Sequence, residues 1–353
     1  MFGFSVFLGT DLSVETKKYL STMSQNGFTG IFTSMHIPED DSSKYKSRMI
    51  ELGSLAKEHG LNVMVDISTA GLSTLGLDMS QDVDKIKALG ITGLRMDYGL
   101  SMAVIAKASH DITVGLNAST LSNQDVSQLQ KHGADFSNME FWHNYYPRVE
   151  TGLDKETFID KNKWLKALGG KVVAFAPGDA VLRGPLFEHL PTLEEHRYSH
   201  PLAASLDLLK ECLVDEVYIG DERIGERTIE QFRAYQTKDL IQLTTEFFTS
   251  DYQSLLTGVH TNRMDSARDV VRSQEARFKD IPPIQQINTV QRKKGSVTLD
   301  NHLYGRYQGE LQIMKKDLIA DARVNVMGKV VDRELGLLQW ITPGQTYQFI
   351  GKE

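Results

Sequence analysis

Residues 60–67 read GLNVMVDI and residues 90–97 read GITGLRMD, and these two segments decide the fold. Each opens on a glycine that can end a helix in the left-handed conformation, continues as an apolar run and carries an aspartate at or next to its end. Continuous apolar runs of this kind are typical of parallel strands covered by helices. The two segments start about 30 residues apart, which is close to the length of one βα unit.

The same pattern recurs over the first two thirds of the chain. The strand-like runs are Phe4–Leu8, Gly30–Met35, Asn62–Ile67, Gly93–Met96, Thr113–Leu116, Phe136–Phe141, Lys171–Phe175 and Glu216–Ile219. Eight runs with helical patterns between them predict an α/β fold, a (β/α)8 TIM barrel over residues 1–238. A doubly wound open sheet is the main alternative. It is disfavoured because no Gly-x-Gly-x-x-Gly fingerprint follows the first run.

The pattern changes near residue 241, after which strand-like segments follow one another with short turns. The expected strands are Ile241–Phe247, Ser296–Leu299, Glu310–Met314, Arg323–Lys329 and Leu335–Ile341, with a helix over Asp265–Phe278. Strands without a helix after each one favour antiparallel pairing. We therefore expect a small, mostly antiparallel β domain over residues 239–353.

Composition excludes several classes of protein. The 353 residues carry 39 Lys+Arg and 46 Asp+Glu, a formal net charge of −7, which argues against a nucleic-acid or anionic-membrane binder. Cys212 is the single cysteine, so there is no intrachain disulfide framework, and we interpret it as a buried structural thiol. No apolar run is long enough to span a membrane, and the apolar N-terminus resembles a buried strand, so we expect a cytoplasmic protein. The histidine spacing predicts no metal, and nothing in the sequence implies a cofactor.

Polar residues follow most of the runs, where the active sites of (β/α)8 enzymes lie. Asp66 and Asp97 are flanked by apolar strand residues, so each must be paired, hydrogen-bonded or functional. Arg95 shares a face with Asp97 and can be a structural bridge to a neighbouring carboxylate. Asp221 follows the eighth run, where a helix cap or a turn is the plain alternative. His36 and Asn117 follow the second and fifth runs.

The segment Glu140–Arg148 reads EFWHNYYPR and combines an acid with aromatic and polar side chains. Aromatic faces stack on sugar rings, and Asn, His and Arg can hydrogen-bond hydroxyl, amide and acidic groups. The alternative is a loop that packs its aromatic residues under a second domain. Arg183 in the loop after the seventh run and Arg306 in a polar, aromatic segment near residues 300–310 are further candidates. A solvent-exposed arginine and a plain hairpin loop are their respective alternatives.

Several motifs together resemble the bacterial 6-phospho-N-acetylmuramidase family, over nearly the whole chain. They are Phe32–Asp40, Val63–Ser68, Leu94–Gly99, Leu116–Ser119, Glu140–Arg148, Arg183–Leu186, Asp300–Ile313 and Arg323–Val326. The resemblance implies a (β/α)8 barrel followed by a cyclophilin-like β domain. It also implies cytosolic hydrolysis of the β-1,4 bond of 6-phospho-N-acetylmuramyl-N-acetylglucosamine in cell-wall recycling. The expected partner is therefore a phosphorylated amino-sugar disaccharide. Nucleic acid and membrane are not expected partners, and a homo-oligomer is left open.

With this activity, Glu140, Asp97 and Asp66 are the expected catalytic carboxylates. Glu140 is favoured as general acid, because burial among aromatic residues would raise its pKa. Asp97 or Asp66 would act as base or would orient the 2-acetamido group. The expected substrate-binding residues are His36, Asn117, His143, Asn144, Tyr145, Arg148, Arg183, Asp221 and Arg306. Two other functions stay open: a sugar-phosphate lyase or epimerase on the same barrel, and a non-enzymatic phosphosugar sensor or interaction protein.

Overall fold

The computed structural model describes residues 1–35, 44–68, 71–72, 76–79, 81–96, 99–278 and 283–352. Its contacts divide the chain into two compact units, Met1–Ile229 and Glu230–Glu353. The division falls inside helix α9 (Glu226–Lys238). Each unit has its own sheet and its own core, and each is described separately below.

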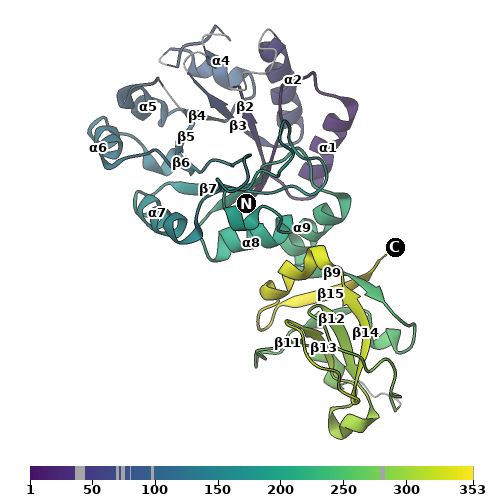
Figure 1. The fold of residues 1–353 in the computed structure, drawn as a ribbon. Coiled ribbons are helices and arrows are strands. Elements are labelled where there is room, and N and C mark those ends of the chain that lie inside the picture. Colours follow the sequence, from purple (N-terminus) through teal and green to yellow (C-terminus); the bar gives the residue numbers. More distant parts are fainter. Residues whose placement is uncertain are drawn as a thin grey trace. The chain divides into compact units, whose positions relative to one another are not determined.

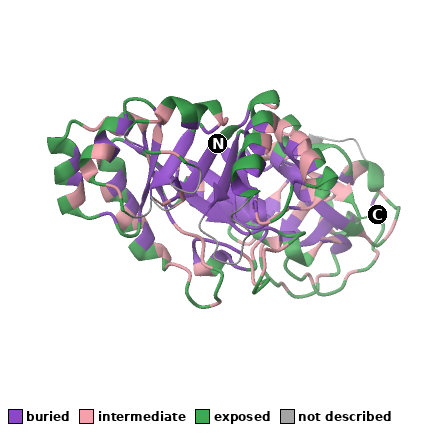
Figure 2. Ribbon diagram, turned by 90° about the horizontal axis from the view of Figure 1, so that it is seen from above, coloured by how far each residue is buried: buried purple, intermediate pink, exposed green. Residues whose placement is uncertain are grey.

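The first unit is a closed barrel of eight parallel strands in sequence order, as the sequence predicts (Figure 1). The strands are β1 (Phe2–Ser5), β2 (Gly30–Ser34), β3 (Asn62–Ile67), β4 (Gly93–Met96), β5 (Thr113–Asn117), β6 (Met139–Trp142), β7 (Lys171–Ala176) and β8 (Glu216–Ile219). The helices are α1 (Val14–Gln25), α2 (Tyr45–Glu58), α4 (Val83–Ala88), α5 (Met102–Ala108), α6 (Asn123–Lys131), α7 (Lys155–Ala167) and α8 (Pro201–Lys210). The strands are almost entirely buried, whereas the helices show exposed outer faces (Figure 2).

Side-chain caps and glycines mark the ends of several of these helices. Ser122 and Asp125 make a reciprocal capping box at the start of α6, because the Ser122 hydroxyl accepts from the Asp125 N–H and the Asp125 carboxylate accepts from the Ser122 N–H. Gly133 follows α6 with a φ of 73°, a conformation that glycine adopts without strain. The chain can therefore turn sharply from the helix into the next strand.

The strand registers arrange the inward-facing side chains of the barrel in layers drawn from alternate strands. The layer nearest the N-terminal strand ends, here called the floor, contains Gly30, Gly93, Glu140 and Glu216. The layer nearest the C-terminal strand ends, here called the mouth, contains Ser5, Asp66, Asn117 and Phe175. Between them lie Gly3, Met64, Gly115 and Val173, and then Phe32, Arg95, Trp142 and Tyr218.

Aromatic rings fill the centre of the barrel. Trp142 stacks on Phe32 with ring centroids 5.3 Å apart, and it also contacts Phe175 and Tyr218. The Tyr218 ring needs glycine on two neighbouring strands, since a Cβ at Gly30 would lie 2.1 Å from the Tyr218 hydroxyl. This plug, formed by Phe32, Trp142 and Tyr218 together with Phe175 of the mouth layer, separates the floor from the rest of the mouth.

The second unit contains a mixed sheet of seven strands in the order β10-β15-β9-β14-β12-β13-β11. The strands are β9 (Leu240–Phe247), β10 (Val259–Thr261), β11 (Val270–Arg272), β12 (Ser296–Asp300), β13 (Leu311–Met314), β14 (Val324–Val330) and β15 (Thr346–Gly351), with the short helix α10 (Gln253–Leu256). Most neighbours are antiparallel, but β15 runs parallel to β9. The core of this sheet includes Leu243, Val297, Ile313, Val326 and Tyr347.

Two local expectations for this unit are wrong. The segment Asp265–Phe278 forms β11 and a 3-10 turn instead of one helix. The segment Leu335–Ile341 lies mostly within a 3-10 helix, Asp332–Trp340, instead of a strand. In both places a short apolar run fits more than one local structure, and pairing elsewhere in the sheet decides between them.

Candidate active site

A paired carboxylate lies at the mouth of the barrel. Arg95 Nη1 donates a hydrogen bond of 2.7 Å to Asp66 Oδ1, and Ser34 Oγ donates to Asp66 Oδ2 at 3.3 Å. Arg95 Nη2 donates to the side-chain oxygen of Asn144. This chain of hydrogen bonds joins β2, β3, β4 and the residues after β6, with the Arg95 guanidinium at its centre. The bridging role left open for Arg95 is confirmed.

The burial of this group makes the ion pair strong. The side chain of Arg95 is 5% exposed and that of Asp66 is 13% exposed, so little water screens the two charges. Asp66 keeps enough exposure to meet a ligand at the mouth. Asn117 lies in the same layer, and its side-chain oxygen accepts from the Ser119 N–H at 3.0 Å.

Tyr145 contributes an uncharged phenol near Asp66. Its ring packs edge-on against Phe32 and Phe175 of the aromatic plug. Burial, and after it the negative charge of Asp66, raises the pKa of Tyr145 to about 12. The hydroxyl therefore keeps its proton at neutral pH and can donate a hydrogen bond to a ligand oxygen.

Glu140 lies at the floor, on the far side of the plug from Asp66, and this corrects the expectation that it acts at the mouth. It is the second residue of β6, it pairs in register with Lys171, the first residue of β7, and it accepts a hydrogen bond of 2.8 Å from Trp142 Nε1. The sequence run begins at Phe136, but residues 136–138 form a 3-10 turn, so the strand starts three residues later than expected. Burial and the charge of Glu216 raise the pKa of Glu140 to about 7.

His143 also points away from the mouth. Its ring packs on Phe158 of α7, and its Nε2 lies 2.7 Å from the side-chain oxygen of Asn162 on the same helix. Burial lowers its pKa to about 4, so the ring is neutral. Its contacts place His143 between the sheet and the helices, so it does not line the mouth as expected for a substrate-binding residue.

Asp221 is completely buried and organises backbone. Its carboxylate accepts hydrogen bonds from the N–H groups of Gly178, Arg183 and Leu190 at 2.8, 3.1 and 3.0 Å. These three residues lie in the loop after β7. The expected substrate contact is therefore replaced by a role in fixing the loop that carries Arg183.

The remaining candidates are dispersed. Arg148 is exposed in the loop after β6, and Arg306 is exposed in the second unit, where it bonds to the Tyr307 hydroxyl. Asp97 and His36 lie outside the described residues.

Arg197 is a residue that the sequence reasoning missed. It is 1% exposed, and its guanidinium donates to the carbonyls of Tyr146, Arg148, Glu188 and His189. It also pairs with Glu194 at 2.6 Å, which lowers the pKa of that carboxyl to about 2. Arg197 thereby ties the loop after β6 to the loop after β7. The only sequence signal was a glutamate three residues before an arginine, which is common on exposed surfaces.

One group within the described ranges has the composition of a metal site. Glu195, His196 and Asp207 place one ligand atom each within 4.8 Å of one another. However, the Lys155 ammonium already lies 2.7 Å from an Asp207 oxygen. The group is explained as an ion-pair network between α7, α8 and the 3-10 turn before α8.

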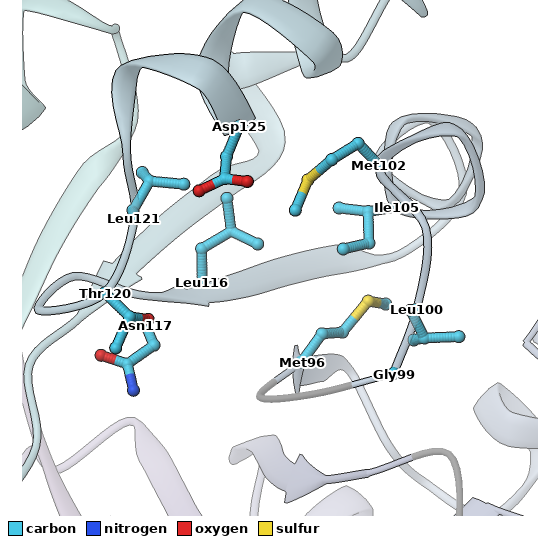
Figure 3. Close-up of a pocket in the computed structure, with 10 residues that line it drawn as sticks. All are labelled: Met96, Gly99, Leu100, Met102, Ile105, Leu116, Asn117, Thr120, Leu121 and Asp125. Atoms are coloured by element: carbon cyan, nitrogen blue, oxygen red, sulfur yellow. The ribbon is translucent and has the colours of Figure 1, made fainter.

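A cavity of about 190 Å³ lies beside the mouth, between β4, β5 and helices α5 and α6 (Figure 3). Figure 3 shows Met96, Met102, Ile105 and Leu116 around it, with the Asn117 amide at its edge. Met96 and Leu116 alternate with the inward-facing residues of their strands, so this cavity is on the helix side of the sheet. We do not place the reacting groups there.

In the described part of the chain, no helix is long and apolar enough to cross a membrane.

Comparison with known proteins gives a consistent match over both units. The model described as "6-phospho-N-acetylmuramidase, N-terminal" matches residues 2–234, and the corresponding C-terminal model matches residues 240–350. No curated protein matches the chain.

Two solved structures resemble the whole chain. A conserved protein of unknown function from Enterococcus faecalis is 44% identical with a TM-score of 0.93, and the match covers 100% of this chain and 96% of that one. An uncharacterised B. cereus protein is 26% identical with a TM-score of 0.74, and the match covers 99% of each chain.

Proposed function

Because the chain belongs to the 6-phospho-N-acetylmuramidase family, we propose that it hydrolyses the β-1,4 glycosidic bond of 6-phospho-N-acetylmuramyl-N-acetylglucosamine. The products are N-acetylmuramic acid 6-phosphate and N-acetylglucosamine. A cytoplasmic role in cell-wall recycling is part of this proposal. The family match over both units is its main support at the level of substrate.

The observation that carries the chemistry is the Asp66–Arg95–Asn144 chain at the mouth. Its geometry holds a charged carboxylate, an amide and a guanidinium in one partly exposed group. A muramyl unit carries a 2-acetamido group and a lactyl carboxylate beside the bond that breaks. An amide-binding carboxylate and a cation next to it match those two groups.

We assign Asp66 to orient the acetamido group by accepting a hydrogen bond from its N–H. The acetamido oxygen then attacks the anomeric carbon as the bond to the N-acetylglucosamine oxygen breaks, a substrate-assisted variant of glycoside hydrolysis. The leaving oxygen takes a proton from a general acid, and water opens the cyclic intermediate while returning a proton. The Tyr145 hydroxyl and the Asn117 and Asn144 amides bind ring substituents.

Asp97 is the proposed general acid. It follows β4 directly in the sequence, two residues after Arg95. Glu140 is not retained in this role, because the aromatic plug separates it from Asp66. Lys171 gives no support to Schiff-base chemistry, since its ammonium pairs with Glu216 at 2.7 Å at the floor.

The test is mass spectrometry of the disaccharide after incubation with the wild-type protein and with Asp66→Asn. The wild type is expected to cleave the disaccharide, and Asp66→Asn to lose about 10²–10⁴-fold in kcat, because the amide cannot supply the negative charge. Asp160→Asn on the exposed face of α7 is the matched control and is expected to keep full activity.

Absence of cleavage by the folded wild type would overturn the glycosidase proposal in favour of the lyase or sensor. Full activity of Asp66→Asn would remove Asp66 from the reaction.

A further inference from the structure

A second cavity, of about 360 Å³, opens at the C-terminal ends of β1 and β8. Its lining includes Phe7, Gly9, Thr10, Tyr19, Arg183 and Arg223. Ser5 also lines it, and Ser5 lies in the same layer of the barrel as Asp66. The cavity is therefore beside the mouth. It is called the arginine pocket below.

Both guanidinium groups of the arginine pocket are held by aromatic rings instead of by carboxylates. Arg183 stacks over the Phe7 ring at 4.0 Å, and Arg223 lies 5.6 Å from the centre of the Tyr19 ring. Arg183 Nη1 approaches Glu222 at 3.7 Å, too far for a strong hydrogen bond. Across the described ranges, the structure gives Arg223 no carboxylate within ion-pair distance. Two cations therefore retain donors that can meet an anion.

Acidic residues near the arginine pocket do not cancel this charge. Asp11 lines the pocket, but Arg48 already pairs with it at 2.9 Å. Arg48 also donates to the carbonyls of Leu8 and Gly9, which fixes the chain after β1. Among the residues that line the pocket, Glu222 is left as one negative charge against two positive ones, and its side chain is 40% exposed to screening water. Glu15 of α1 also interacts with Arg223, but its side chain is exposed and does not line the pocket.

The backbone holds the two arginines in place before any ligand binds. Arg183 N–H donates to the buried Asp221 carboxylate. Arg223 N–H donates to the Val181 carbonyl at 3.1 Å, which bridges the loop after β7 to the loop after β8. The cations thus come from two segments that are fastened to each other, and a ligand loses little free energy in ordering them.

We propose that the arginine pocket binds the 6-phosphate of the muramyl unit, with Arg183 and Arg223 as its specificity-determining residues. A phosphomonoester carries close to two negative charges and three acceptor oxygens, which suits two guanidinium groups and the Thr10 hydroxyl. The lactyl carboxylate has only one charge, so a pair of guanidinium groups matches the phosphate better. This inference rests on the proposed function and names the substrate group that the site selects.

The experiment compares kcat/KM for the phosphorylated and the unphosphorylated disaccharide. The wild type is expected to prefer the phosphorylated form, and Arg223→Ala to lower kcat/KM for that form by about 30–100-fold without changing the other. Arg183→Ala is expected to act in the same direction, and the two lysine variants to recover part of the preference. Arg268→Ala, an exposed arginine of the second unit, is the matched control. An equal loss on both substrates, or no loss, would overturn the proposal.

A binding measurement separates this inference from the proposed reaction. Calorimetry compares N-acetylmuramic acid 6-phosphate with N-acetylmuramic acid on wild type and on Arg223→Ala, with no turnover required. Tighter binding of the phosphorylated sugar by the wild type alone supports the arginine pocket even if no disaccharide is cleaved. Equal binding of both sugars by the wild type contradicts it even if cleavage is observed.

Discussion

Asp66 and Glu140 are both carboxylates on inward-facing positions of barrel strands, yet their surroundings differ in kind. Asp66 faces a guanidinium and keeps contact with the mouth. Glu140 faces Glu216 across the floor and is covered by the Trp142 ring. The ion pair with Arg95 positions Asp66 where it can meet a ligand, whereas burial raises the pKa of Glu140 and favours its protonated form.

This contrast predicts how stability depends on pH. The folded-state pKa of Glu140, about 7, lies above its unfolded value of 4.5, so its contribution is complete below pH 4.5 and is lost as pH rises through 7. Glu140→Gln cannot ionise and still offers an oxygen to Trp142. Between pH 5 and pH 8 the wild type should lose about 2.5 kcal/mol more unfolding free energy than the variant. Urea denaturation at both pH values measures this difference.

The same variant should retain turnover within a factor of about three, since the carboxyl lies behind the plug. If the unfolding free energies of the two proteins changed with pH in parallel, folding would not raise the pKa of Glu140 and the stability prediction would be wrong. A large loss of turnover by Glu140→Gln at unchanged stability would show that Glu140 is a catalytic residue.

At the scale of elements, the loop after β7 depends on one buried carboxylate. Asp221 accepts three backbone N–H groups that would otherwise be unpaired in an apolar environment. Asp221→Ala should destabilise the protein by about 2–4 kcal/mol and speed hydrogen exchange of the amides of residues 178–190. It should also raise KM for the phosphorylated substrate more than it lowers kcat.

Hydrogen-exchange mass spectrometry tests this expectation, with Asp179→Ala as the comparison. Asp179 caps the start of α9 through Gly225 and Thr228, so its loss should affect α9 instead of the loop. Unchanged exchange in residues 178–190 of Asp221→Ala would mean that other contacts hold the loop.

Elements also show how far the sequence could predict the structure. Three of the eight expected runs, Asn62–Ile67, Gly93–Met96 and Glu216–Ile219, match their strands residue for residue, because buried parallel strands are predominantly apolar. The expected start of β6 is three residues too early, because the apolar Phe136 belongs to a 3-10 turn and not to the strand. That shift moved Glu140 from the mouth to the floor. No local pattern distinguishes the two ends of a strand in such a case.

The contacts of the candidate site that could not be predicted from the sequence are those between residues far apart in the chain. The Asp66–Arg95 pair joins neighbouring strands, and its existence follows from two polar residues in apolar runs. The Arg95–Asn144 contact and the Arg197 network join loops whose conformations depend on the whole barrel. In the second unit, β10, β11 and β15 lie at or next to the edges of the sheet and have only three to six residues. The sequence did not predict these strands, because their pairing partners are distant in the chain.

At the scale of the whole molecule, the two units have separate cores and should lose structure separately. Val297 is fully buried in the second sheet, between β13 and β14. Val297→Ala should lower the stability of Glu230–Glu353 by about 2 kcal/mol through the lost methyl groups and the remaining cavity. Hydrogen exchange should then accelerate in β9 and β12–β15 and stay unchanged in β1–β8. Equal acceleration in both units would show that they unfold as one.

The aromatic plug affects how substrate enters and how products leave the barrel. Phe32, Trp142, Phe175 and Tyr218 fill the interior, so a ligand at the mouth cannot leave through the barrel towards the floor. A disaccharide and both of its fragments must therefore enter and leave on the mouth side, and we expect the fragment bound nearer the plug to leave second. Release should therefore be ordered, and the second product to leave should compete with fresh substrate, whereas the first should not.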